Sequence, residues 1–103
     1  MNLNCAQAMI KKRYLDKIKA EIKPVALSNK RAKFFIFGSS LRKEKFGDID
    51  LAVTGVGRAV LAEIKERFTE STLPYFVDVV DFSKAKASFK KNVLSDKILW
   101  IKR

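Results

Sequence analysis

The sequence of 103 residues contains no histidine, one cysteine, two prolines and four glycines. The lack of histidine excludes Ser-His-Asp hydrolysis, HExxH zinc sites, Cys/His zinc fingers and acid/base catalysis by an imidazole. Because Cys5 has no second cysteine with which to form an internal disulfide, the chain fits a reducing compartment, and we expect it to be cytoplasmic. Because histidine is absent, any catalysis must use carboxylates, amines, hydroxyls or a metal ion held by oxygen.

Long apolar runs are also missing. The first segment, MNLNCAQAMIKKRY, has no apolar stretch long enough for a signal peptide, and later uncharged runs are too short to cross a bilayer. We therefore expect neither export nor insertion into a membrane.

Basic residues are abundant and unevenly placed. The 22 Lys and Arg against 11 Asp and Glu give a net charge of +11. Residues 1–45 hold 12 basic and 3 acidic side chains, residues 46–82 hold 3 and 7, and residues 83–103 hold 7 and 1. An acidic middle within a basic chain is typical of a metal site that receives a polyphosphate, although solvated helix faces explain most of the lysines.

The apolar pattern predicts a single α+β (α/β-type) domain over residues 1–103, with a small mixed β-sheet flanked by helices. The expected order is helix, strand, short helix, strand, helix, strand, helix. We expect most aromatic residues in the core, with Tyr75 and Trp100 as exceptions. The expected elements are a helix over 6–23 ended by Pro24, strands over 34–37, 48–53 and 75–82, a helix over 60–68, and a last helix, capped by Ser83, that runs past Phe89, Val93 and Leu94 toward Ile98 and Trp100.

Three carboxylates interrupt the predicted strands. Asp48 and Asp50 are two residues apart, so on a strand they project to the same side. Asp78 lies in the apolar run YFVDVVDF, where an ionised acid is costly unless a cation or hydrogen bonds offset it. If strand 75–82 lies beside strand 48–53, the three acids converge, and Mg²⁺ is the ion that such oxygen donors prefer.

A possible phosphate-binding turn precedes these acids. Gly38 and Ser39 follow the strand Phe34–Phe37 directly and start a short helix. Glycine lets the backbone approach a phosphate closely, while the serine hydroxyl and free N–H groups can bind it. The sequence therefore predicts a phosphate cradle next to a metal site.

The stretch FFIFGSSLRKEKFGDIDLAV resembles the signature of the DNA polymerase beta-like nucleotidyltransferases, most closely the short prokaryotic minimal nucleotidyltransferases. YFVDVVDF is similar to their third motif, in which one Asp completes a carboxylate triad. The resemblance covers residues 34–82. It implies that Asp48, Asp50 and Asp78 hold two Mg²⁺ ions and are the catalytic residues.

The resemblance also implies nucleotide-binding residues. Gly38, Ser39, Ser40 and Arg42 would bind the triphosphate of ATP, with Arg42 matching the second arginine of the frequent pattern Gly-Ser-Arg-Ala-Arg-Gly. Ser40 stands in place of the first arginine, and the gap to Asp48 is shorter than is common in the family.

Minimal nucleotidyltransferases commonly pair with a helical HEPN-domain protein as the antitoxin of a toxin-antitoxin module. The resemblance therefore implies transfer of AMP from ATP to a tyrosine hydroxyl of that HEPN toxin, by a monomer or an oligomer. Two alternatives stay open: nucleotidyl transfer to an RNA or small-molecule acceptor, which the basic residues 1–45 favour, and a non-catalytic basic module that binds RNA or a partner.

Overall fold

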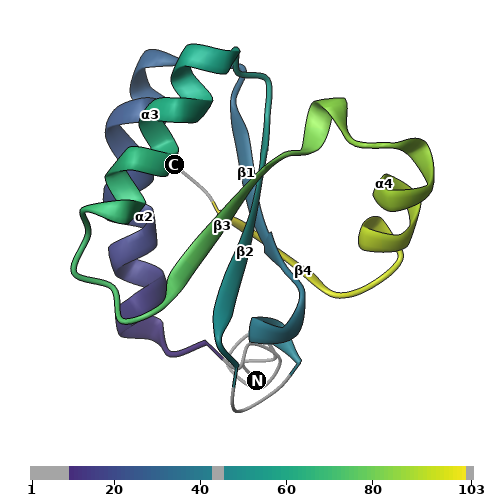
Figure 1. Cartoon of the computed structure of the whole chain (residues 1–103), viewed down its shortest axis with the longest axis horizontal. Coiled ribbons are helices and arrows are strands. Elements are labelled where there is room, and N and C mark those ends of the chain that lie inside the picture. Colours follow the sequence, from purple (N-terminus) through teal and green to yellow (C-terminus); the bar gives the residue numbers. More distant parts are fainter. Residues whose placement is uncertain (1–9, 43–45, 102–103) are drawn as a thin grey trace.

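The computed structural model describes residues 10–42 and 46–101 (Figure 1). Helices and strands alternate along most of this part of the chain. The elements are helix α2 (Lys12–Ser28), strand β1 (Lys33–Phe37), the 3₁₀ helix η1 (Ser39–Leu41), strand β2 (Asp48–Thr54), helix α3 (Arg58–Thr69), strand β3 (Phe76–Asp81), the 3₁₀ helix η2 (Phe82–Lys84), helix α4 (Ala87–Leu94) and strand β4 (Ile98–Ile101).

The strands form one mixed sheet in the order β3-β2-β1-β4. Strands β1 and β2 pair antiparallel, as do β1 and β4, whereas β2 and β3 are parallel and are joined by the crossover helix α3. A parallel pair needs such a crossover, which explains why a helix separates these two strands. The predicted α+β class, with a small mixed sheet flanked by helices, is confirmed.

The two faces of the sheet are covered by different helices. Helices α2 and α3 lie together on one face, and α4 lies on the other (Figure 1). Successive strand residues point to opposite faces, so Phe34 and Ile36 join the large cluster under α2 and α3, while Phe35 joins a small cluster with Phe82 and Val93. We call these the helix-covered face and the α4 face.

The predicted end of the first helix at Pro24 is wrong, because α2 continues to Ser28. Pro24 has no N–H and so cannot donate the usual intrahelical hydrogen bond. Its ring is exposed, however, and Val25 and Ala26 just beyond it are buried against the sheet. Burial of these side chains offsets the lost hydrogen bond. The helix begins at Lys12, and residues 6–9 of the predicted helix lie outside the described residues.

The predicted last helix is wrong in its second half. Helix α4 ends at Leu94, and Ile98–Ile101 forms strand β4 beside β1. These four consecutive apolar residues, rich in β-branched and aromatic side chains, suit a sheet edge, and Ile101 is buried there. Ser83 is part of η2 and accepts a hydrogen bond from the Gly55 N–H, so it does not cap α4.

No helix within residues 10–42 and 46–101 has both the length and the apolar character needed to cross a bilayer.

Candidate functional site

The three predicted acids lie on adjacent strands and share the α4 face of the sheet. Asp48 and Asp50 belong to β2 and Asp78 to β3, and the parallel register places Asp50 directly opposite Asp78. Their neighbours Ile49 and Leu51 are fully buried under α2 and α3, so the acids face the other way. The condition for the three acids to converge, that strands β2 and β3 are neighbours, is met.

Asp50 is the most enclosed of the three acids. It is half-buried, whereas Asp48 and Asp78 are exposed. Burial raises the pKa of the Asp50 carboxyl above its usual 3.8, and the negative charges of Asp78 and Asp48 raise it further, while Arg42 opposes them. The charges of all three carboxylates therefore act on the same place, and a cation there would relieve their repulsion.

The donor chemistry of this group fits Mg²⁺, because every donor is a carboxylate oxygen. Across residues 10–42 and 46–101, however, no three or more Cys, Asp or Glu side chains are gathered into a cluster that could hold a metal ion. Asp48 and Asp78 are exposed, so their side chains are free to change rotamer without disturbing the core. The backbone thus brings the three predicted acids to neighbouring positions of the sheet.

Gly38 allows the turn after β1 to lie directly against the Asp50 side chain. Its φ is +87°, and a Cβ atom added there would lie 2.2 Å from Oδ2 of Asp50. Only glycine adopts this backbone conformation at little cost and leaves room for the carboxylate. The 3₁₀ helix η1 begins at the next residue, Ser39, so the predicted phosphate-binding turn touches the predicted acidic site.

A cleft of about 520 Å³ lies at this contact. One wall consists of the predicted residues Gly38, Ser39, Arg42 and Asp50. The other comes from the region of α4, which the sequence indicated only as a helix with core residues. Among the described residues, the lining consists of Phe37, Gly38, Ser39, Arg42, Asp50, Phe89, Asn92, Val93, Asp96 and Lys97. Asp48 and Asp78 lie beside Asp50 on the sheet but do not line this cleft.

The α4 wall was missed because it carries no motif. Phe89 and Val93 repeat at helical spacing, which predicts a core-facing stripe as readily as a cleft wall. The turn that brings α4 over the end of β1 follows from the pairing of β4 with β1, which was not predicted. The only signal in the sequence was the spacing of Phe89 and Asn92, which are three residues apart and therefore lie on one face of a helix.

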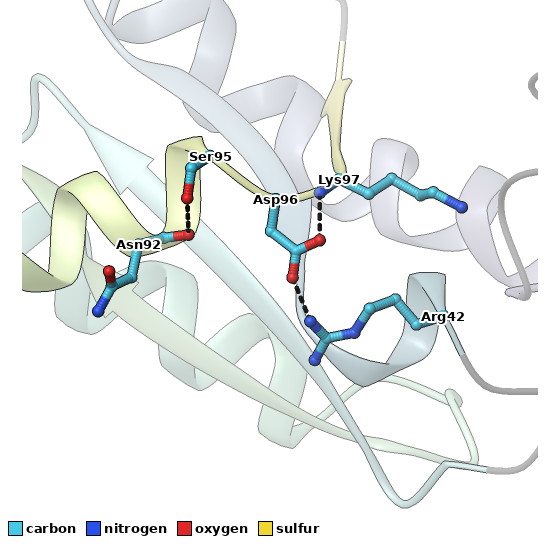
Figure 2. Close-up of polar contacts among 5 residues, drawn as sticks. All are labelled: Arg42, Asn92, Ser95, Asp96 and Lys97. Atoms are coloured by element: carbon cyan, nitrogen blue, oxygen red, sulfur yellow. Dashed lines mark hydrogen bonds and ion pairs between the residues drawn. The ribbon is translucent and has the colours of Figure 1, made fainter.

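Arg42 joins the two walls of the cleft. Its guanidinium donates a hydrogen bond to the Asp96 carboxylate and forms an ion pair with it, reaching from the end of η1 to the loop between α4 and β4 (Figure 2). The Lys97 backbone N–H, donating to the same carboxylate, and the charge of Arg42 lower the pKa of Asp96. The arginine predicted to bind a triphosphate thus lies at the cleft, with its charge partly neutralised.

Ser40 does not line the cleft, although the sequence predicted that it binds nucleotide. The side chain is fully buried, and its Oγ atom has no hydrogen-bond partner among the described residues. In a 3₁₀ helix, successive side chains point about 120° apart, so Ser39 faces the cleft while Ser40 faces the core. We therefore leave the Ser40 side chain out of the nucleotide contacts.

Comparison with known families places most of the chain in one of them. The family model described as Polymerase beta, Nucleotidyltransferase matches residues 20–103. The match extends well beyond the signature region 34–82 and includes all of the described residues that line the cleft. No curated protein matches the chain.

Proposed function

Because the chain belongs to the polymerase beta nucleotidyltransferase family, we propose that the cleft beside Asp50 binds ATP for metal-dependent transfer of AMP. The acceptor we propose is a tyrosine hydroxyl of a helical HEPN-domain toxin, for which this chain is the cytoplasmic antitoxin. The nucleotide chemistry is supported by the family, and the acceptor by the resemblance of residues 34–82 to minimal nucleotidyltransferases.

The contact between Gly38 and Asp50 carries the proposal. The first N–H groups of η1 and the Ser39 hydroxyl can bind phosphate oxygens, and the Asp50 carboxylate lies against that turn. A phosphate held by the turn is therefore next to the acids. If Gly38 only filled the core, or if the aspartates were only solvated, the turn and the Asp50 carboxylate would not need to lie this close together.

The acids act together in the proposed reaction. The acceptor oxygen attacks the α-phosphorus of ATP, the bond from that phosphorus to the α,β-bridging oxygen breaks, and pyrophosphate leaves. Asp48, Asp50 and Asp78 would hold the metal ions, and Asp78 also helps to take the proton of the attacking hydroxyl. Mg²⁺, when bound, supplies positive charge that stabilises the developing negative charge of the transferred and leaving groups.

Exposure of the acids suits a large acceptor. Asp48 and Asp78 are exposed on the α4 face, outside the cleft lining, so a protein hydroxyl can approach them without entering the cleft. The chain supplies no histidine, so it cannot itself carry the histidine-dependent ribonuclease motif of a HEPN toxin. The antitoxin is therefore the member of the pair that this sequence suits.

The second candidate is transfer to RNA. Residues 1–45 hold 12 basic and 3 acidic side chains, a balance that attracts a phosphate backbone. The same charge would serve a basic module that binds RNA without catalysis, so the acceptor and the role of the acids must be tested together.

The test is a transfer assay with ATP labelled on its α-phosphate. The chain is incubated with Mg²⁺ and either the product of the neighbouring gene or total RNA, and the assay is repeated with Asp48→Ala. Glu66→Ala, an exposed acid on α3 at the helix-covered face, is the matched control. Label on the partner protein that disappears only in Asp48→Ala supports the proposal.

Two other results would overturn it. Label on RNA that depends on Asp48 identifies RNA as the acceptor. No label on any acceptor, together with salt-sensitive RNA binding that survives Asp48→Ala, shows a binding module in which the acids have no catalytic role.

A further inference from the structure

The α4 wall of the cleft presents an aromatic ring and an amide side by side. Phe89 and Asn92 are three residues apart on α4, so they occupy one face of the helix, and both line the cleft. The opposite wall is polar and is formed by Gly38 in the turn after β1, Ser39 at the start of η1 and Asp50 on β2. One side of the cleft therefore suits a phosphate whose charge is offset by a cation at Asp50, and the other suits a flat group with hydrogen-bonding edges.

Phe89 is held in place and yet accessible. Its ring lies 6.1 Å from the Phe37 ring, at an interplanar angle of 80°, and 6.2 Å from the Phe82 ring. Despite these contacts the residue is 39% exposed, whereas Phe82 is buried. An aromatic ring that is braced by its neighbours and open to a cleft can stack on a base without first being ordered.

Asn92 adds a group that can read the edge of a base. Its side-chain amide projects from α4 (Figure 2) and makes no hydrogen bond with any described residue. The amide offers both donors and an acceptor, which is the combination that pairs with the edge of adenine. The only contact of Asn92 shown in Figure 2 is its backbone carbonyl, which accepts a hydrogen bond from the Ser95 hydroxyl.

We propose that α4 forms the base subsite of the nucleotide cleft, with Phe89 stacking on the adenine ring and Asn92 bonding its edge. This inference rests on the proposed function, since it assigns the part of ATP that the phosphate-binding turn leaves free. The cleft volume of about 520 Å³ is in the range typical of small-ligand sites. The acceptor is kept apart, because Asp48 and Asp78 lie outside the cleft lining.

Equilibrium binding of two ligands tests the stacking role. The affinities of the wild-type chain and of Phe89→Ala are measured for ATP and for inorganic triphosphate, which has no base, both with Mg²⁺ and no acceptor. We expect Phe89→Ala to bind ATP about tenfold more weakly, with triphosphate binding unchanged. Phe89→Tyr, which keeps the ring, restores ATP binding. Leu94→Ala is the control, because Leu94 is exposed on the same helix but does not line the cleft.

The two ligands separate loss of stacking from loss of structure. Equal weakening of both ligands in Phe89→Ala would show that Phe89 only supports the fold of the cleft, and no change in either would place the base elsewhere. Both results overturn the subsite but leave the proposed function standing. A wild-type chain that binds neither ligand overturns the proposed function as well.

Asn92 provides a variant that leaves the packing of α4 intact, since its side chain is exposed. We expect the wild-type chain to bind ATP more tightly than GTP and expect Asn92→Ala to reduce that ratio by about tenfold, because one base-edge contact is lost. A ratio that does not change in Asn92→Ala contradicts the assignment of this residue.

Discussion

The two faces of the sheet differ in their roles: one stabilises the fold, and the other carries the groups of the proposed reaction. The helix-covered face buries nearly all of the large side chains of the core against α2 and α3. The α4 face buries only a cluster around Phe35, Ala52, Phe82 and Val93, and its remainder carries carboxylates and the cleft. One face supplies the burial that folds the chain, so the other can hold groups that repel one another.

Strand β2 allows a direct test, because its neighbouring residues point to opposite faces. Asp50 belongs to the α4 face and Leu51 to the helix-covered face. If the two roles are separate, substitutions at these adjacent positions will affect different measurements.

Asp50→Asn is expected to have the largest effect, on catalysis. The substitution keeps the size of the side chain but removes a charge that holds the metal ions in the proposed reaction. We expect nucleotidyl transfer to fall by about 1000-fold, equivalent to ~4 kcal/mol of transition-state stabilisation. The measurement is the single-turnover rate with labelled ATP.

The control for this prediction is Glu66→Ala, whose transfer rate should match that of the wild type. Transfer by Asp50→Asn within tenfold of the wild-type rate would show that the acids of the α4 face are not the reactive centre.

Leu51→Ala should act almost entirely on stability. Leu51 is fully buried in the cluster beneath α2 and α3, so truncation leaves a cavity. We expect the free energy of unfolding to fall by about 3 kcal/mol in urea denaturation. Phe76→Ala is the matched control, because Phe76 is a larger apolar residue that is 65% exposed on the neighbouring strand. Equal losses in the two variants would contradict the division between the faces.

Gly38→Ala should reduce both stability and ligand binding, because Gly38 lies in the turn after β1 and approaches Asp50 of the α4 face. The residue has φ +87° and ψ −158°, a conformation that costs a residue with a Cβ atom about 2 kcal/mol, and that Cβ would also displace the Asp50 carboxylate. We expect a loss of stability of that size in urea denaturation, and weaker triphosphate binding.

Gly47→Ala is the control for this change. No atom of residues 10–42 and 46–101 lies within 4 Å of a Cβ atom added at Gly47, so stability should stay the same or rise slightly. Similar losses in both variants would mean that Gly38 has no special contact with Asp50.

The sequence predicted where most helices and strands lie better than it predicted where they end. Helical periodicity located α3, and short apolar runs rich in β-branched and aromatic residues located the three strands β1, β2 and β3. Local signals failed at Pro24 and at Ile98–Ile101. In both places long-range packing decided the outcome, with α2 held by the sheet and β4 held by β1.

The site was predictable where its residues are close in sequence or share a strand. Gly38, Ser39, Asp48 and Asp50 fall within one short stretch, and Asp78 stood out as a lone acid in an apolar strand. The α4 wall depends on a strand pairing between residues far apart in the chain, which no local pattern encodes. Ser40 shows the same limit, because only the turn of η1 decides that its side chain points inward.

The smallest expected effect is a pH dependence of stability, which tests whether the acids of the α4 face destabilise the fold. The pKa of Asp50 is raised in the folded chain by burial and by Asp78 and Asp48, so the folded state binds this proton more readily than the unfolded state. Stability from this group is therefore lost as pH rises from the usual value of 3.8 through the raised pKa, and stays lost above it. Asp50→Asn removes the charge, and because solvent screens this half-exposed group, the variant should be more stable than wild type at pH 7 by only on the order of 0.5 kcal/mol. The gain should vanish in acid, where Asp50 is protonated in both states. Urea denaturation of both proteins across this pH range measures the difference, and a difference that is independent of pH would show that the α4 face bears no electrostatic cost for its acids.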